Sequence, residues 1–188
     1  MPSLKVIVEG YAKEIKQGWE ANSTTTLIEN DGKYIIVDPG MDEAILKKAL
    51  AAEGLTAEDI NFVFLTHYHL DHILNVALFK KAKMADGYYM YDGKRGTDHT
   101  GSPFGKGIEI LHTPGHTPEH SSLLVHSDGC TYAIAGDLIW WAFHEKEKML
   151  KLPDPFAYDM KALIKSREEI LNKADFIIPG HGKMVKLK

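Results

Sequence analysis

The amino-acid sequence predicts a protein of the α/β (α+β) class, and three observations indicate this. Short apolar runs that end at Gly, Pro, Asn or Asp recur along the chain and are typical of strands. Longer segments between them carry apolar residues three and four positions apart, as helices do. Histidines and aspartates directly follow several of the strand-like runs, so polar side chains from distant segments can meet at one edge of a sheet.

The predicted strands are the most regular feature of the chain. Two of them flank Asn30-Asp31-Gly32, whose Asp-Gly pair is typical of a tight hairpin. The stretch 92–106 is rich in Gly, Asp, Thr and Ser and predicts an exposed connection, with a mobile substrate-facing flap as the alternative. The predicted strands are residues 4–9, 23–29, 33–37, 60–65, 84–91, 107–113, 122–126, 131–135 and 175–179.

Helical spacing occurs in three segments, residues 41–53, 73–82 and 160–173. Gly54 is placed to end the first helix, and Asp159 is placed to cap the third. The predicted buried stripes of the first two helices are Ile45, Leu46, Ala49 and Leu50, and Ile73, Leu74, Ala77 and Leu78.

Composition limits the class of protein. The 188 residues, 44% of them hydrophobic, are enough for one sizeable core, and we expect a single domain over residues 1–188. The formal net charge is −4, so composition allows nucleic acid as a partner but does not favour it. Cys130 is the only cysteine, which excludes an intrachain disulfide. No segment resembles a signal peptide or a membrane span, so we expect a cytoplasmic protein with no membrane partner.

The most specific motif is the turn from Thr66 to His72, which reads His67-x-His69-x-Asp71-His72. Imidazole nitrogen is a strong ligand for zinc, and carboxylate oxygen suits a second cation or a bridging position. Residues two apart in an extended turn point the same way, so His67 and His69 can bind one ion. Asp71 and His72 begin the following helix and point toward a second ion. A solvated His-rich turn is the alternative, but the strand before the motif and the helix after it favour a metal site.

Three further metal-type residues, His116, Asp137 and His181, follow predicted strands in the same way. Asp38 also closes a buried strand, where it can orient the metal-binding turn as a hydrogen-bond acceptor, act as a cap or turn former for the next helix, or do both. The remaining histidines lack the full pattern; they are His99, His112, His120, His126 and His144.

These motifs resemble the metallo-β-lactamase superfamily over nearly the whole chain. The matching segments are Val37-Asp38-Pro39-Gly40, the turn from Thr66 to His72, Thr113-Pro114-Gly115-His116-Thr117, Gly136-Asp137 and Pro179-Gly180-His181-Gly182. The resemblance implies a four-layer αββα sandwich of two mixed β-sheets flanked by helices, with the metal ions at one rim.

The resemblance also implies a role for each candidate ligand. Two divalent metal ions are expected, with zinc as the default and iron or manganese as alternatives. The implied ligands are His67, His69 and His116 for the first ion, Asp71, His72 and His181 for the second, and Asp137 as the bridge. Asp71 and Asp137 are the expected catalytic residues. Asp137 would bridge the two ions, and Asp71 can also accept a hydrogen bond from the attacking water.

We therefore expect a dinuclear metal-dependent hydrolase in which a metal-activated hydroxide attacks a small ester, thioester or lactone. A phosphodiesterase or endoribonuclease of the same superfamily is one alternative, and a mononuclear iron enzyme similar to persulfide dioxygenases is another. Glyoxalase II-like members have similar histidine turns but add a C-terminal helical region, and only seven residues follow His181, so a glutathione thioester is not the expected substrate. The expected partner is a small molecule, and a homodimer is one option for the assembly.

Two features near the predicted site keep open roles. His120 lies four residues after His116 and either protonates a leaving group or sits outside the reacting centre. Trp140, Trp141 and Phe143 either line a substrate pocket or pack a helix onto the sheet.

Overall fold

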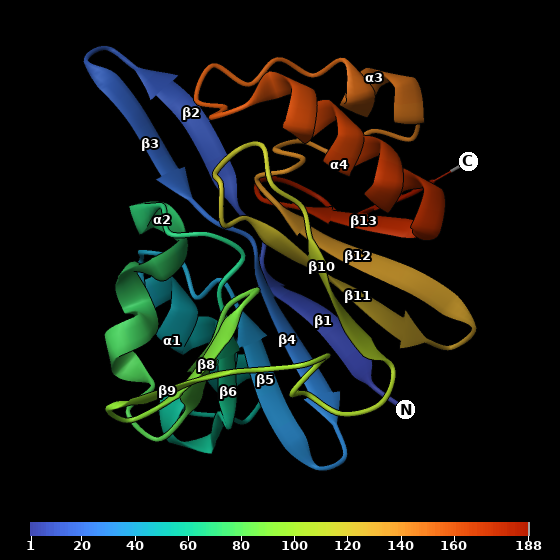
Figure 1. The fold of residues 1–188 in the computed structure, drawn as a ribbon. Helices are drawn as coiled ribbons and strands as arrows, with labels where there is room; N and C mark the ends of the chain where they lie inside the picture. The colour runs from blue at the N-terminus through green and yellow to red at the C-terminus, as the bar shows by residue number, and fades with distance from the viewer. Residues whose placement is uncertain (188) are drawn as a thin grey trace.

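A computed structural model describes residues 1–187 and shows the four-layer arrangement expected from the resemblance (Figure 1). Two mixed β-sheets face each other, and helices cover the outer face of each. The predicted fold class is confirmed.

The first sheet is mixed and carries the His-rich turn. Its strands, in spatial order, are β1 (Ser3–Val8), β4 (Thr25–Asn30), β5 (Lys33–Val37), β6 (Phe62–Phe64), β7 (Lys83–Ala85), β8 (Tyr89–Asp92) and β9 (Arg95–Asp98). The turn between β4 and β5 has positive φ at Asp31 (50°) and Gly32 (71°), as the predicted tight hairpin requires. β5 and β6 are parallel with Val37 opposite Phe64, so both strands end at the same sheet edge.

The second sheet brings the other candidate residues to the same rim. Its strands, in spatial order, are β10 (Ile108–His112), β11 (Ser121–Ser127), β12 (Cys130–Gly136), β13 (Phe176–Pro179) and β14 (Val185–Lys186). β12 and β13 are parallel, with Gly136 opposite Pro179, and the other neighbours are antiparallel. Asp137 and Gly180 therefore leave the sheet side by side.

The helices lie on the outer faces of the sheets. They are α1 (Glu43–Ala52), α2 (Leu70–Ile73), α3 (Lys146–Leu150) and α4 (Met160–Lys173), with 3₁₀ turns η1 (Ala57–Asp59) and η2 (Leu74–Leu78). Asp159 caps α4 as predicted, because its carboxylate accepts hydrogen bonds from the backbone of Lys161 and Ala162. None of the helices in residues 1–187 has the length and apolar character needed to cross a membrane.

The core follows from the two-residue period of the strands. In β5, Ile35 and Val37 face the space between the sheets, whereas Ile36 faces α1. Phe104 fills the space between the sheets with its ring edge-on to Phe64. Burying a side chain of this size stabilises the fold by about 1.5–3 kcal/mol. A third cluster joins the second sheet to α4.

Several predicted elements differ from the structure. The helix expected over 73–82 is replaced by the end of α2 and by η2, and Leu74 is 52% exposed rather than buried. The buried side chain of Asn75 donates to Pro39 O, which ties this segment to the end of β5 and interrupts regular helix. Ile45 in α1 is likewise exposed.

The predicted strand over 84–91 is in fact two strands. The Asp86 carboxylate accepts hydrogen bonds from the backbone of Tyr88 and Tyr89, and this turn separates β7 from β8. Residues 95–98, expected to lie in an exposed connection, form the edge strand β9 instead. All four residues of β9 are exposed, so no apolar alternation marks it as a strand.

A hairpin of β2 (Tyr11–Ile15) and β3 (Gly18–Asn22) was not predicted and extends away from both sheets (Figure 1). Most of its side chains are exposed, so it lacks the pattern of a buried strand. Its base contacts the turn between β13 and β14 through a bridge between Gly10 and Gly182. The hairpin therefore stands beside the turn that carries His181.

Candidate metal centre

The turn between β6 and α2 presents its metal-type side chains at the rim where both sheets end. His67 and His72 are fully buried, whereas His69 is exposed. The structure brings all seven predicted residues together in two groups, each able to hold an ion: His67, His69, His116 and Asp137 in one, and Asp71, His72 and His181 in the other. Their role as ligands remains a prediction.

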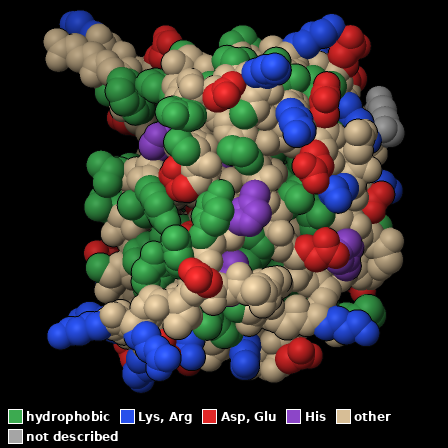
Figure 2. All heavy atoms as spheres, in the orientation of Figure 1, with side chains coloured by type: hydrophobic (Ala, Val, Ile, Leu, Met, Phe, Trp, Pro, Cys, Tyr) green, Lys and Arg blue, Asp and Glu red, His purple; other side chains and the backbone are tan. Residues whose placement is uncertain are grey.

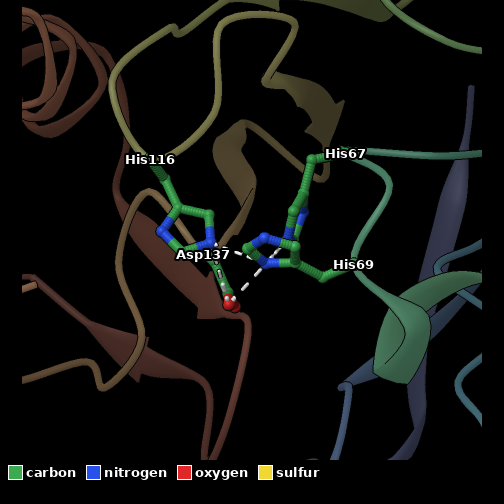
Figure 3. A group of neighbouring side chains, drawn as sticks. All are labelled: His67, His69, His116 and Asp137. Carbon is green, nitrogen blue, oxygen red and sulfur yellow. Dashed lines mark hydrogen bonds and ion pairs between the residues drawn. The ribbon is translucent and has the colours of Figure 1, made fainter. Parts of the chain in front are cut away.

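The first group converges on one point (Figure 3). His69 Nδ1 lies 3.1 Å from His67 Nε2 and 3.0 Å from His116 Nε2. Asp137 Oδ2 lies 3.5 Å from His116 Nε2 and 3.9 Å from His67 Nε2. Ligand atoms around a tetrahedral zinc ion with Zn–N distances of about 2.0–2.1 Å would be about 3.3 Å apart, so the donor spacing suits such an ion.

The second group shares Asp137 with the first. Asp137 Oδ1 lies 3.2 Å from His72 Nε2 and 3.4 Å from His181 Nε2. Asp71 Oδ2 lies 3.5 Å from His181 Nε2 and 3.8 Å from His72 Nε2. The two carboxylate oxygens of Asp137 thus face different donor groups, which is the arrangement of a bridging ligand.

Two atoms in this centre, His72 Nε2 and Asp137 Oδ1, are buried and lie 3.2 Å apart, but neither makes a hydrogen bond of acceptable geometry. An unsatisfied buried polar atom costs about 1–3 kcal/mol, so such atoms call for a partner. Both belong to the donor groups, and a divalent cation would satisfy both. Nitrogen and carboxylate donors in this mixture also match the ligand preference of zinc.

Glycine makes room for the Asp137 carboxylate. A Cβ atom on Gly180 would lie only 1.9 Å from Asp137 Oδ1. Any larger residue at position 180 would therefore displace the Asp137 side chain from between the donor groups.

Asp38 orients the His-rich turn. Its carboxylate accepts hydrogen bonds from Thr66 N (2.9 Å), Thr66 Oγ1 (2.7 Å) and His72 Nδ1 (2.8 Å). Because Thr66 Oγ1 donates to Asp38, it accepts from His67 Nδ1 at 3.0 Å. The Nε2 atoms of His67 and His72 remain free to face the centre. Asp38 does not cap α1, since Asp42 does, but its positive φ of 48° fits the role of turn former after β5.

Asp154 orients His116 as Asp38 orients His72, and the sequence did not predict this role. Its Oδ2 atom lies 2.7 Å from His116 Nδ1, and its side chain is fully buried. His181 Nδ1 donates to Asn22 O at 3.2 Å, so this histidine also presents Nε2 to the centre. The Pro153-Asp154-Pro155 sequence signals a turn, but nothing in it indicates which histidine it approaches.

The pKa values of the histidines and aspartates in this centre depend on burial and on one another's charges. Burial alone would raise the pKa of Asp137, but the charges of His72 and His181 outweigh burial and hold it well below its usual value. Burial would lower the pKa of His72, whereas Asp137 and Asp38 raise it well above the ordinary value. Burial, followed by the charge of His72, lowers the pKa of His67.

His120 lies behind the donor groups. Its Nε2 atom accepts a hydrogen bond from Leu138 N at 3.3 Å, so Nδ1 carries the proton and donates to Thr113 Oγ1 at 2.9 Å. Burial, with a smaller effect from His116, lowers its pKa to about 3. Both ring nitrogens are occupied and the ring is neutral, so the geometry favours a position outside the reacting centre over leaving-group protonation.

Trp140, Trp141 and Phe143 were expected either to line a substrate pocket or to pack a helix, and they differ in position. The Trp140 ring lies 5.9 Å from the His116 ring, and the Trp141 ring lies 6.1 Å from the His181 ring. Phe143 instead packs against the core below α4. The two tryptophans adjoin the centre, whereas Phe143 packs a helix.

Comparison with known proteins shows which family this architecture belongs to. A family model described as the metallo-beta-lactamase superfamily matches residues 18–99. Metallo-beta-lactamase domain-containing protein 1 of Xenopus laevis is 34% identical over 96% of this chain and 79% of its own length. A protein of Methanocaldococcus jannaschii, described as a metallo-hydrolase, is 34% identical over 80% of this chain and 72% of its own length.

Two further matches are more distant. A hydroxyacylglutathione hydrolase of Xanthomonas campestris is 32% identical over 65% of this chain and 48% of its own length. The crystal structure of a metallo-beta-lactamase-type protein of Thermotoga maritima superposes with a TM-score of 0.77, at 22% identity, over 98% of this chain and 99% of the other. The chain belongs to the metallo-beta-lactamase superfamily and is a hydrolase of that superfamily.

Proposed function

We propose that this chain is a dinuclear metallohydrolase that cleaves a neutral ester, thioester or lactone. The observation that carries the proposal is the position of Asp137, whose two oxygens face two separate donor groups within 3.9 Å of the histidine nitrogens. A carboxylate in that position would hold two cations, whose chemistry would be that of hydrolytic two-metal sites. Zinc is the ion that the donor set favours.

Divalent ions bound here would supply Lewis acidity and lower the pKa of a water molecule. The residues of the chain would position the reactants. The side chain of Asp71 is 20% exposed, against 5% for Asp137, so Asp71 is the carboxylate that an incoming water can reach. It can accept a hydrogen bond from this water and orient it toward the substrate.

Four histidines are held with Nε2 toward the centre by partners at Nδ1, namely Thr66 for His67, Asp38 for His72, Asp154 for His116 and Asn22 O for His181. Fixed tautomers and ring orientations keep the donor groups in place before a substrate arrives. This pre-organisation favours catalysis, because positioning is complete in the ground state.

The candidate centre is built from histidines and aspartates. Apart from burial, the largest influences on the pKa values of His67, Asp137 and His181 come from other histidine and aspartate side chains. A phosphodiester substrate would favour cationic side chains near the cleavage point. The matched Xanthomonas hydrolase, whose name indicates a thioester substrate, is consistent with acyl transfer to water. The cytoplasmic location and the assembly state remain predictions.

The proposal is tested by elemental analysis combined with a panel of chromogenic esters, thioesters, lactones and bis-nitrophenyl phosphate. We expect two equivalents of metal per chain and metal-dependent turnover of at least one carbonyl substrate. His116→Ala should lose one equivalent and most of this activity. Turnover of the phosphodiester alone would replace the proposal with the phosphodiesterase alternative, and one equivalent of iron without hydrolysis would favour the oxygenase alternative.

A further inference from the structure

Arg167 on α4 carries its charge in the protein interior. Figure 2 shows Lys and Arg side chains at the molecular surface, where water solvates them, whereas Arg167 is fully buried. Moving a charge out of water is costly unless partners inside the protein compensate for the lost solvation. The partners of Arg167 therefore indicate what its charge does in this fold.

Arg167 holds the segment that joins β12 to α4 at two points. Its Nε atom donates to Leu138 O at 2.7 Å, and its Nη1 atom donates to Leu152 O at 2.5 Å. Leu138 directly follows Asp137, and Leu152 lies two positions before Asp154. One planar guanidinium thus joins the backbone beside the candidate bridging carboxylate to the backbone beside Asp154.

The backbone that follows Leu138 also holds the turn that carries His181. Gly180 N donates to Ile139 O at 3.1 Å, and His181 N donates to Trp140 O at 2.9 Å. The hydrogen bond from the guanidinium to Leu138 therefore fixes a stretch of backbone on which both donor groups depend.

Asp154 is a carboxylate whose charge acts on Arg167. Its side chain is fully buried, with one oxygen 2.7 Å from His116 Nδ1 and the other accepting from Phe156 N at 3.0 Å. Burial lowers the pKa of Arg167, and the charge of Asp154 opposes this shift. Each buried charge thus compensates for the other, which favours an Asp154 side chain that stays in the interior against His116.

We propose that Arg167 is a positioning residue for the candidate metal centre. It keeps Asp137 in place through the backbone of Leu138. It also balances the buried charge of Asp154, so that this carboxylate stays in contact with His116. This inference rests on the metal site of the proposed function. An arginine that only stabilises the core is the alternative, and the two differ in their effect on zinc affinity.

The first experiment measures zinc affinity by competition with a coloured chelator, on the full chain and at a temperature where circular dichroism shows each variant to be folded. Arg167→Met removes the charge and both donors, and its affinity should fall by about tenfold, the lower end of the range for a direct partner of a metal-binding histidine. Arg167→Lys keeps the charge, so its affinity should lie between that of Arg167→Met and that of the wild type. If Arg167→Met does not fold, Arg167→Lys takes its place throughout.

Ile170→Ala is the matched control. Ile170 lies one turn further along α4, is fully buried and packs in the same core cluster, but it has no polar group that could hold the segment after Asp137. This variant should unfold at lower urea concentration, while its zinc affinity stays within about twofold of the wild type. Equal zinc affinity in Arg167→Met and Ile170→Ala would overturn the proposal, because Arg167 would then only stabilise the core.

A double-mutant cycle tests the connection through Asp154. If Arg167 acts through this carboxylate, the fold-change in zinc affinity caused by Arg167→Met should be smaller by about threefold in an Asp154→Asn background than in the wild type. The same fold-change in both backgrounds would overturn this connection, since the effects of independent sites add.

The last measurement needs no metal, so it separates this inference from the proposed function. In the chelator-treated wild type, the His116 Nδ1–H proton that is bonded to Asp154 should give a protected signal in proton NMR. It should exchange with solvent about tenfold faster in Arg167→Met than in Ile170→Ala, because local opening of the pair becomes easier. Absence of zinc binding by the wild type would overturn the proposed function, whereas equal exchange rates in the two variants would overturn the role of Arg167.

Discussion

His116 and Asp154 are joined by a buried hydrogen bond of 2.7 Å between Nδ1 and Oδ2, although 38 positions separate them in the chain. With Nδ1 occupied, Nε2 is the nitrogen that faces His69 and Asp137. Asp154 therefore fixes the ring orientation and the tautomer of a candidate ligand, as carboxylate partners do for metal-binding histidines.

Loss of the Asp154 carboxylate should weaken metal binding. In Asp154→Ala we expect the affinity for zinc to fall by about 10- to 100-fold, because the imidazole becomes less basic and free to rotate. Asp154→Asn keeps an oxygen acceptor, so its zinc affinity should lie between that of Asp154→Ala and that of the wild type. Competition with a coloured zinc chelator measures the affinity directly.

Asp159→Ala provides the control for this series. Asp159 lies at the end of the same loop and caps α4 without contacting a donor group. Its removal should lower the free energy of unfolding by about 0.5–2 kcal/mol while zinc affinity stays at the wild-type value. Equal zinc affinity in Asp154→Ala and the wild type would exclude the positioning role.

Asp38 should matter for stability as well as for the site. Asp38→Ala removes one acceptor from three donors, two on Thr66 and one on His72, all in a buried environment. Breaking such a buried network costs about 3–5 kcal/mol, so we expect a loss of that order in urea unfolding of the chelator-treated protein. Asp38→Asn should cost less, because it tolerates the positive φ of 48° and keeps one acceptor oxygen. If Asp38→Ala lost less unfolding free energy than Asp38→Asn, the network would not hold the turn.

The predicted ligands could be found from sequence because each follows an apolar strand directly. Asp137 and His181 need only the rule that parallel strands end at one rim, which the register of β12 and β13 satisfies, whereas His116 follows the edge strand β10, which is antiparallel to β11. Asp154 lies in a loop without such a register, so its contact with His116 depends on the packing of α4 and cannot be read from spacing. The predicted helix over 73–82 failed for a related reason, since the buried side chain of Asn75 bonds across the fold.

The neutral state of His120 predicts a pH dependence for the metal-free protein. Burial lowers its pKa in the folded chain to about 3, against an ordinary value of 6.5. The unfolded chain therefore binds more protons between these values, and stability falls as the pH drops through that window, whereas the contribution is complete above the ordinary value. Between about pH 6.5 and 5, the loss attributable to this residue is up to about 2 kcal/mol.

The comparison for this prediction is His120→Gln, which can accept from Leu138 N and donate to Thr113 Oγ1 without titrating. Urea unfolding of both proteins in the presence of a chelator should give curves of stability against pH that diverge as the pH falls, with the wild type the steeper. Parallel curves would mean that His120 does not titrate as its burial requires.

Removal of divalent ions should lower the unfolding temperature. The centre packs buried His72 Nε2 and Asp137 Oδ1 without a hydrogen bond of acceptable geometry, and a bound cation would satisfy both atoms. An ion that binds only the folded state adds about 4 kcal/mol at a free concentration 1,000 times its Kd. We expect a decrease in differential scanning fluorimetry after chelation, reversed by added zinc, and a much smaller response in Asp137→Ala. His126→Ala, which alters an exposed histidine paired with Glu109 outside the donor groups, should respond like the wild type. An unfolding temperature that is the same with and without zinc would remove the metal-ion assignment from these residues.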